Sequence, residues 1–372
     1  MKALSDAALY KLAKDIRGWA RDLGFDAIGI SATDLSEAAL ALRKWLQQGW
    51  HGEMDFMDRH VQERTRPELL VPDTVRVISV RLGYWRASGA GALETLRDPE
   101  KAYIARYALG RDYHRPMRRR LQKLADQITE SVGPFSYRAF TDSAPVMEKP
   151  LGQNAGLGWL GKNTNLIDPK TGSWFFLGEL YTDLPLPVDI PHSDHCGSCS
   201  RCSVACPTGA LDTPYQLDAR RCIAYLTIEH KSAIPESLRP MIGNRIFGCD
   251  DCQLVCPHND SPGTGNELFS PRHGLENANL VDLFNWSPKE FEHYTNGSTL
   301  RRLGYERWMR NLAVALGNGV PDEKVKKALE ARLGKISDMV NEHINWALHR
   351  LNAHPDSATR TPGCQRSARD SI

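Results

Sequence analysis

Residues 5–23 place apolar side chains at helical spacing, which predicts an amphipathic helix with Ser5 in position to cap its first turn. Residues 26–31 contain the short apolar run AIGIS and predict a strand. Residues 75–84 are rich in β-branched side chains and predict a second strand. Residues 111–131 predict a long helix with many basic side chains. Helices and strands thus alternate from the start, which indicates helices packed on a sheet.

Two further strands are predicted by the apolar runs FSYRAFTD and WFFLGELYTDL, at residues 135–142 and 174–184. We therefore expect one α/β domain over residues 1–187, whose strand order the pattern does not determine. Three prolines follow closely, at Pro185, Pro187 and Pro191. Because proline stiffens a connecting segment, this stretch predicts a linker and a domain boundary.

The rest of the chain divides into three parts. Residues 188–262 hold the cysteine-rich block. Residues 263–353 carry the helical stripes RWMRNLAVALGN and VNEHINWALHRL, which predict helices over 305–317 and 322–351 and resemble a single HEAT-type repeat. Residues 354–372 are polar and are expected to form a disordered tail. The fold class expected for the whole chain is α+β.

Composition places the chain among folded enzymes. Its 372 residues are 41% hydrophobic and 25% charged, close to the average for globular proteins. The N-terminus shows no signal peptide, membrane span or twin-arginine pair, so we expect a cytoplasmic protein without membrane contact. In that reducing compartment its 9 cysteines are better explained as metal ligands than as disulfides.

Net charge does not identify a partner, because 47 basic residues nearly balance 45 acidic ones. Any nucleic-acid contact must therefore come from a local patch. Two clusters of arginines are candidates; they are Arg115, Arg118, Arg119 and Arg120, and Arg301, Arg302, Arg307 and Arg310. Each cluster is equally well explained as the solvated face of a helix. Trp159 and Trp308 could stack on bases, although tryptophan more often belongs to a core.

The cysteines follow the spacing of bacterial two-cluster ferredoxins. Cys196, Cys199, Cys202 and Cys206 form C-x2-C-x2-C-x3-C followed by proline, the run in which the fourth cysteine ligates the other cluster. A second group, Cys222, Cys249, Cys252 and Cys256, repeats the ending of the first but has its opening cysteine displaced upstream, so that a helix in IAYLTIEHKS must return it.

By this crossover rule, one 4Fe-4S cluster takes Cys196, Cys199, Cys202 and Cys256, and the other takes Cys206, Cys222, Cys249 and Cys252. A pair of zinc knuckles is the alternative, but the duplicated spacing favours clusters. Cys364 is expected to be an unused thiol. Clusters move electrons only, so the substrate chemistry must come from another part of the chain.

The glycine-rich segment TDSAPVMEKPLGQNAGLGWLGKNTNL, residues 141–166, resembles a binding site because glycine lets a backbone approach a ligand closely. Its G-x-G-x-x-G follows no clear strand, so dinucleotide binding is only weakly indicated. Asp142 follows a predicted strand and precedes an Ala-Pro turn, where a carboxyl could act as a proton donor. The simpler interpretation is a helix or turn cap.

Together, several motifs closely resemble the epoxyqueuosine reductase family. They are R-Y-A-x-G-R-D-Y-H from Arg106, D-S-A-P-V-x-E-K from Asp142, A-G-L-G-W-x-G-K-N from Ala155 and F-G-C-D-D-C-Q-x-V-C-P from Phe247. The resemblance extends to about residue 350. It implies an N-terminal cobalamin-binding domain over 1–187, a ferredoxin-like two-cluster domain over 188–262 and a helical HEAT-like segment over 263–353.

The resemblance also implies roles for single residues. Asp142 is similar to the family's proton donor and the eight clustered cysteines to its cluster ligands. The expected neighbours of the cobalamin, besides Asp142, are Ala105, Leu166, Leu177, Ile223, Tyr225, Asp250 and Asp251. Some relatives carry a cysteine above the cobalt face, where this chain has Ala105 and Arg106, so no thiolate is needed there.

The implied reaction reduces epoxyqueuosine to queuosine at the wobble position of a tRNA anticodon. An external low-potential donor would supply electrons through two 4Fe-4S clusters to cobalamin, and Asp142 would supply a proton. The expected partner is tRNA, and the expected assembly is a monomer. The alternatives are a cobalamin-dependent reductive dehalogenase acting on a small molecule, or a ferredoxin-type electron-transfer protein.

Overall fold

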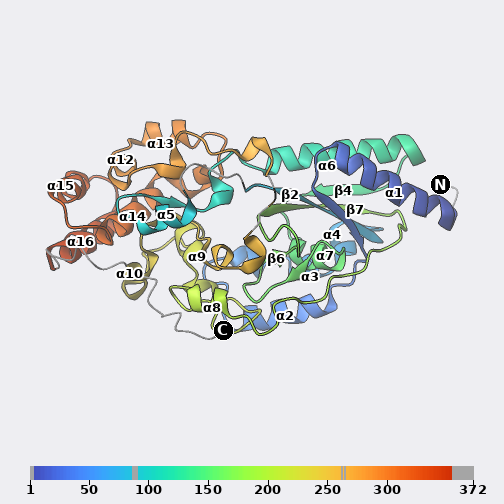
Figure 1. Cartoon of the computed structure of the whole chain (residues 1–372), viewed down its shortest axis with the longest axis horizontal. Helices are drawn as coiled ribbons and strands as arrows, with labels where there is room; N and C mark the ends of the chain where they lie inside the picture. The colour runs from blue at the N-terminus through green and yellow to red at the C-terminus, as the bar shows by residue number, and fades with distance from the viewer. Residues whose placement is uncertain (1–3, 86–90, 261–262, 264, 354–372) are drawn as a thin grey trace. The chain divides into compact units, whose positions relative to one another are not determined.

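The computed structural model describes residues 4–85, 91–260, 263 and 265–353 (Figure 1). The chain folds into two compact units that interleave along the sequence. The described parts of Met1–Trp85, Tyr113–Cys199 and Pro257–Asn266 make the first unit, and those of Arg86–Asp112, Ser200–Cys256 and Glu267–Ile372 make the second. The contacts therefore group the residues differently from the consecutive ranges expected. The predicted tail and Cys364 lie outside the described residues.

The first unit is built on a four-stranded sheet of order β1-β2-β7-β4. Its strands are β1 (Ala27–Ser31), β2 (Arg76–Gly83), β4 (Tyr137–Phe140) and β7 (Phe175–Thr182). All four predicted strands are confirmed. Every ladder in this sheet is antiparallel, so the alternation of helices and strands along the chain does not build a parallel sheet.

Helices cover both faces of this sheet. Helices α1 (Asp6–Asp22) and α6 (His114–Val132) pack on one face, and α7 (Glu148–Asn154) packs against β1, β2 and β7 on the other (Figure 1). Ser5 caps α1 as predicted, because its hydroxyl accepts from the Ala8 N–H. The remaining helices and short strands of the unit are α2 (Ser36–Gln47), α3 (Val61–Thr65), α4 (Pro67–Leu70), β5 (Trp159–Leu160) and β6 (Leu166–Ile167).

Alternation along β7 decides which of its side chains face α7. A Cβ on Gly178 would lie 3.1 Å from both Leu121 and Met117 of α6, so this position faces α6. Because neighbouring residues in a strand point to opposite faces, Glu179 and Tyr181 face α7. Tyr181 packs there in an apolar cluster with Leu151 of α7. A carboxyl group at Glu179 is therefore enclosed between sheet and helix, where it is 0% exposed.

The second unit is mainly helical. Helix α14 (Gly304–Gly317) lies at its centre and packs against α12, α16 and the short strand β8. Its other elements are α5 (Ala92–Arg97), β3 (Tyr103–Ile104), α8 (Arg201–Ala205), α9 (Ile223–Ile228), α10 (Arg239–Ile242), β8 (Arg245–Phe247), α11 (Asp251–Leu254), α12 (Leu280–Phe284), α13 (Pro288–Tyr294), α15 (Glu323–Arg332) and α16 (Asp338–Ala353). The predicted helices over 305–317 and 322–351 are present, the latter as two helices.

The second of the two arginine clusters is only partly exposed. Arg310 is 0% exposed and donates to the backbone oxygens of Leu226, His230 and Ser232. Its guanidinium thus joins α14 to α9 and the segment after it, and the expectation that it contacts a phosphate is wrong. Trp308 is likewise 0% exposed, so it belongs to the core and is not available to stack on a base. Among the described residues, no helix has the length and apolarity that a membrane crossing requires.

Candidate active site and cluster ligands

Asp142 stands at the end of β4 in a backbone conformation that presents its carboxyl outward. Its φ is 57°, in the left-handed region that non-glycine residues rarely occupy. The side chain is 45% exposed, although Thr141 before it is buried. The N-cap of α7 is Met147, so Asp142 does not cap that helix, which is one of the two forms of the simpler interpretation. Strain at a partly exposed carboxyl is typical of a functional position.

Two side chains from the start of α6 hold the Asp142 carboxyl. The Tyr113 hydroxyl donates to Oδ2 at 2.7 Å, and His114 Nε2 lies 3.3 Å from the same oxygen. The Tyr113 ring is fixed in turn, because it stacks on Phe176 of β7 with ring centroids 3.9 Å apart. The motif R-Y-A-x-G-R-D-Y-H thus supplies, at its last two residues, the partners of the aspartate.

A second pair of acidic groups lies behind the Asp142 backbone. The Asp142 N–H donates to Oε1 of Glu148, the first residue of α7. The Glu148 carboxyl is within hydrogen-bonding reach of the buried Glu179 carboxyl of β7. Burial, followed by the charge of Asp142, raises the pKa of Glu148 to about 7. Burial, followed by the charge of Glu148, also raises the pKa of Glu179 well above its usual range.

Neither glutamate was singled out from the sequence, although both left a signal. Glu148 is the glutamate of D-S-A-P-V-x-E-K, and Glu179 is the one acid of strand β7, Phe175–Thr182. An acid in a strand buried on both faces requires a partner, and this pattern could have indicated one.

The glycine-rich segment forms a small hairpin. Strands β5 and β6 pair Trp159 with Ile167, and Gly158, with φ at 151°, lies where a Cβ would be 2.3 Å from the Ile167 oxygen. The G-x-G-x-x-G therefore continues into a strand and does not begin a helix, so it lacks the helix N-terminus that binds a pyrophosphate. The predicted cobalamin neighbours Leu166 and Leu177 meet in one apolar cluster of this unit.

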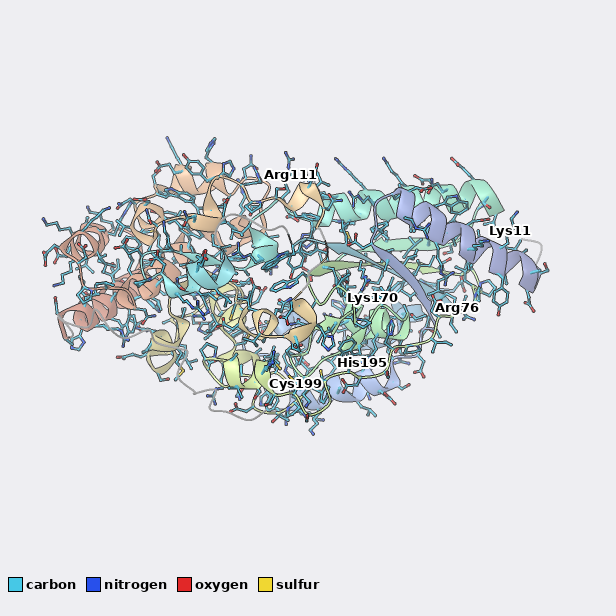
Figure 2. The ribbon with its side chains drawn as sticks, viewed as in Figure 1. Lys11, Arg76, Arg111, Lys170, His195 and Cys199 are labelled. Carbon is cyan, nitrogen blue, oxygen red and sulfur yellow. The ribbon has the colours of Figure 1, made fainter. Side chains whose placement is uncertain are left out.

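Trp159 and Lys162 of this hairpin contact the first cysteine run. The buried Trp159 indole donates its Nε1–H to Cys196 Sγ at 3.5 Å, which excludes it from stacking on a base. Lys162 Nζ donates to the backbone oxygens of Gly197 at 2.6 Å and Cys199 at 2.9 Å. Cys199 and the neighbouring His195 are labelled in Figure 2. The hairpin thus fixes the loop that carries the thiols of Cys196 and Cys199.

The second unit gathers four cysteines from separate segments. Burial raises the pKa of Cys252, and the charges of the nearby Cys222 and Cys206 raise it further. Cys252 in turn lies close enough to Cys249 for its charge to raise the pKa of that thiol. All eight clustered cysteines are free thiols. Nowhere in the described part of the chain do three His, Cys, Asp or Glu side chains converge as a site for one metal ion. A cubane separates its ligands over its corners, so four thiols can serve it without such convergence.

The remaining predicted cobalamin neighbours lie in the second unit. Asp250 is 2% exposed and accepts from the Tyr103 hydroxyl at 2.7 Å and the Arg106 N–H at 2.8 Å, while burial raises its pKa to about 6. Asp251 forms a buried ion pair with Arg245. The other three are buried; they are Ala105, which bonds to β8 through its N–H, and Ile223 and Tyr225 of α9.

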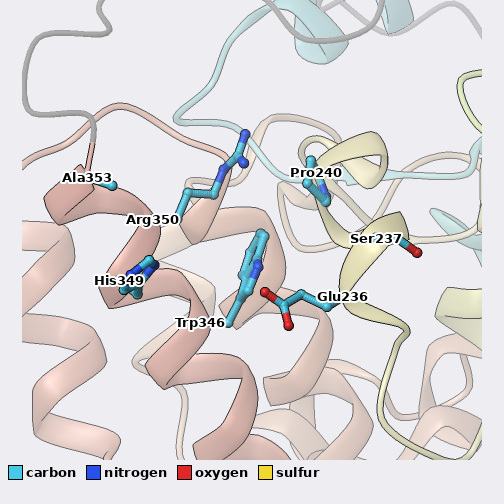
Figure 3. Close-up of a pocket in the computed structure, with 7 residues that line it drawn as sticks. All are labelled: Glu236, Ser237, Pro240, Trp346, His349, Arg350 and Ala353. Carbon is cyan, nitrogen blue, oxygen red and sulfur yellow. The ribbon is translucent and has the colours of Figure 1, made fainter.

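A cavity of about 470 Å³ in the second unit lies apart from these residues (Figure 3). Glu236, Trp346, His349 and Arg350 contribute to its lining, and Figure 3 shows the Trp346 ring standing between Glu236 and Arg350. None of the predicted site residues lines it. It is therefore not part of the candidate active site.

Comparison with known proteins tests the interpretation of both sites. Residues 64–143 match the family described as "Epoxyqueuosine reductase QueG, DUF1730", and residues 195–259 match the "4Fe-4S double cluster binding domain". The second match supports iron–sulfur clusters over zinc knuckles.

Full-length relatives agree. The epoxyqueuosine reductase of Pseudomonas aeruginosa is 57% identical over 342 residues, which cover 91% of this chain and 94% of the relative. That of Escherichia coli is 52% identical over 341 residues, covering 91% and 89%.

Two solved structures share the fold. A crystal structure of epoxyqueuosine reductase with an epoxyqueuosine-modified tRNA-Tyr stem loop has a TM-score of 0.85 at 28% identity and covers 93% of this chain and 92% of that one. The enzyme from Bacillus subtilis, with its catalytic aspartate loop swung out of the active site, has a TM-score of 0.83 at 28% identity with the same coverage. This chain therefore belongs to the epoxyqueuosine reductase family.

Proposed function

We propose that this chain reduces epoxyqueuosine carried by tRNA to queuosine, with Asp142 as the proton donor. The observation that supports this most directly is the outward-facing Asp142 carboxyl between Tyr113 and His114. The relative that contains an epoxyqueuosine-modified stem loop has the same fold over most of this chain. The B. subtilis structure, in which a catalytic aspartate loop swings out, supports a corresponding role for the Asp142 loop.

The reaction removes the epoxide oxygen as water and takes up two electrons and two protons. A carboxyl that protonates the departing oxygen makes it a better leaving group. The Tyr113 hydroxyl orients the Asp142 carboxyl by donating to it. The His114 ring lies against the same oxygen and, when protonated, can return a proton to the carboxylate after each turnover. The base must be extruded from the anticodon stack to reach such a site.

Electrons would pass through two 4Fe-4S clusters with the ligand sets predicted from the cysteine spacing. The donor set fits, because eight free thiols are present and Cys206, Cys222, Cys249 and Cys252 interact within the second unit. Cobalamin, when bound, would supply the two-electron reduction of the substrate carbon. The partly exposed Asp142 and the apolar pair Leu166 and Leu177 would be among the residues that hold the corrin.

The test of the proposed function is anaerobic turnover of epoxyqueuosine-containing tRNA by protein with reconstituted clusters. With a strong reductant and cobalamin, nucleoside mass analysis should show loss of one oxygen, and without cobalamin it should show none. Corrinoid binding measured by absorbance is an independent readout. Bound corrinoid without conversion would favour the dehalogenase alternative, and absence of corrinoid binding would favour plain electron transfer.

The arginines of α6 are the better of the two candidate tRNA-binding clusters. Arg115, Arg118 and Arg119 are exposed on one helix, whereas Arg310 of the second cluster is buried in the core. Replacing the three exposed arginines with Gln should weaken tRNA binding. The slope of log K against log salt should fall by about 0.7–0.9 for each phosphate that the variant no longer neutralises. Filter binding at several salt concentrations measures this slope.

The matched control removes the same charge from α1, where Lys11, Lys14 and Arg21 are exposed (Lys11 is labelled in Figure 2). If both triple variants change the slope equally, the effect is one of net charge and α6 does not bind the tRNA.

We further propose that the chain acts as a monomer in the cytoplasm. We also propose that α14 to α16 form a HEAT-like element, which the close packing of α14 against α16 supports.

A further inference from the structure

The Asp142 loop is held from behind by a residue outside the proposed chemistry. Asp142 has a φ of 57°, and such a conformation persists in a non-glycine residue only where surrounding contacts impose it. The contact at this point is the bond from the Asp142 N–H to Glu148 Oε1. Since Glu148 is the first residue of α7, this bond ties the loop to a helix packed on the sheet.

Glu148 is in turn coupled to Glu179. The Glu179 side chain is completely buried, and in the described part of the chain neither of its oxygens meets a conventional donor. The neighbouring polar group within hydrogen-bonding reach is the Glu148 carboxyl. Two carboxylates in contact away from water cannot both be ionised, and one proton between them satisfies both. Glu179, the more enclosed of the two, is the natural carrier of that proton.

Other charged or titratable groups surround this pair. Asp142 lies on the loop and His114 on α6, while Tyr181 stands next along the same face of β7, and Arg64 acts on the pair from α3. Arg64 forms no ion pair with either of these two described glutamates, and its guanidinium donates to the Phe56 oxygen. The pair therefore balances its charge mainly by retaining a proton.

We propose that Glu148 and Glu179 share one proton and together act as a latch that holds the Asp142 loop in its catalytic position, with Glu148 as the positioning residue. This inference rests on the proposed role of Asp142. An anionic Glu148 accepts the Asp142 N–H in a charge-assisted bond, and a protonated Glu148 accepts it more weakly. Glu179 keeps Glu148 anionic by donating its proton to it.

The latch should depend on pH. Burial raises the pKa of Glu148 from 4.5 to about 7, so the carboxyl takes up a proton and the latch loosens as pH falls through about 7. The folded protein holds this proton where the unfolded chain would release it. The contribution of Glu148 to global stability therefore falls as pH rises from 4.5 to about 7, opposite in direction to the strength of the latch.

Hydrogen exchange of residues 141–147 in the cluster-loaded full chain tests the latch without requiring turnover. In the wild type, protection should fall as pH is lowered from about 8 to about 6. Glu148→Ala should exchange about tenfold faster than the wild type at pH 8, and its protection should not depend on pH. Glu179→Leu removes the donor and should shift the loss of protection to higher pH, whereas Glu179→Gln keeps a donor and should match the wild type. Wild-type protection in Glu148→Ala would overturn the proposal.

Two further readouts separate this proposal from the role of Asp142 itself. Glu148→Ala should lower kcat with little change in KM, whereas Asp142→Asn should lower kcat without faster exchange of the loop. If Asp142→Asn remains active while Glu148→Ala loosens the loop, the latch is retained and the proton donor is wrong. The infrared band of a protonated buried carboxyl should be lost in Glu179→Gln at neutral pH. An unchanged band would contradict the shared proton.

Discussion

Replacing Asp142 with asparagine is expected to lower kcat by about 10²- to 10⁴-fold, the usual contribution of a positioned general acid. Asparagine keeps the size of the side chain and an oxygen that can accept from the Tyr113 hydroxyl, so the loop should keep its contacts. The amide cannot release a proton to the departing oxygen. The rate is measured in single turnovers with saturating tRNA, followed by nucleoside mass analysis.

Asp73 provides a matched control. It is another exposed aspartate with positive φ, at 64°, and none of the proposed chemistry involves it. Asp73→Asn should therefore turn over at the wild-type rate. If Asp142→Asn also retains that rate with intact clusters and unchanged tRNA affinity, the proton must come from another group, and Tyr113 and His114, which both contact Asp142, are the candidates.

Replacing Cys222 with serine should abolish turnover and remove one of the two proposed clusters. This cysteine immediately precedes α9, and its charge raises the pKa of Cys252, so the two thiols lie close together. It is also the ligand that stands upstream of the position expected from a regular ferredoxin repeat. Loss of one thiolate of four should leave about half of the iron and acid-labile sulfide bound. Electrons would then have no complete path to the substrate, whatever the state of Asp142.

Two other cysteines make this result specific. Cys364→Ser should retain all the iron, because this thiol lies outside the cluster motifs. Cys196→Ser should lose the other cluster, with an electron paramagnetic resonance spectrum different from that of Cys222→Ser. Full iron content in Cys222→Ser would show that the crossover ligand assignment is wrong.

The local elements were predictable because their signals are local. Helices α1 and α14 and strands β1, β2 and β7 begin and end within a few residues of the ranges expected from apolar spacing. The predicted helix over 322–351 is instead two helices. Gly334, with φ at 73°, lies between them. A residue in the left-handed conformation ends a helix, so the chain cannot continue as one helix through this position.

Features that depend on distant segments were not predictable from one sequence. The central place of β7 between β2 and β4 depends on pairings that no local pattern encodes. Arg310 lies within a basic cluster in the sequence, yet backbone oxygens of α9 and of the segment after it satisfy it in the core. Glu148 and Glu179 are adjacent only because β7 returns past the start of α7.

For the candidate site, the sequence indicates the reactive residues better than the residues that hold them in position. Asp142 and the cysteines carry motif signals that reflect their reactions. The groups that orient them were missed, because a positioning role depends on three-dimensional contact. Tyr113 and His114 stand in the sequence only as the end of a motif, and the bond from Trp159 to Cys196 has no counterpart in residue spacing.

The interleaving of the two units has a consequence for synthesis on the ribosome. The Asn259 side chain accepts from the Ser173 N–H at 2.7 Å and donates to the Ser173 hydroxyl at 3.0 Å, so a residue beyond the last cluster cysteine completes the sheet-containing unit. That unit cannot finish folding while only its N-terminal segments have emerged. The cysteines therefore leave the exit tunnel before either unit is complete.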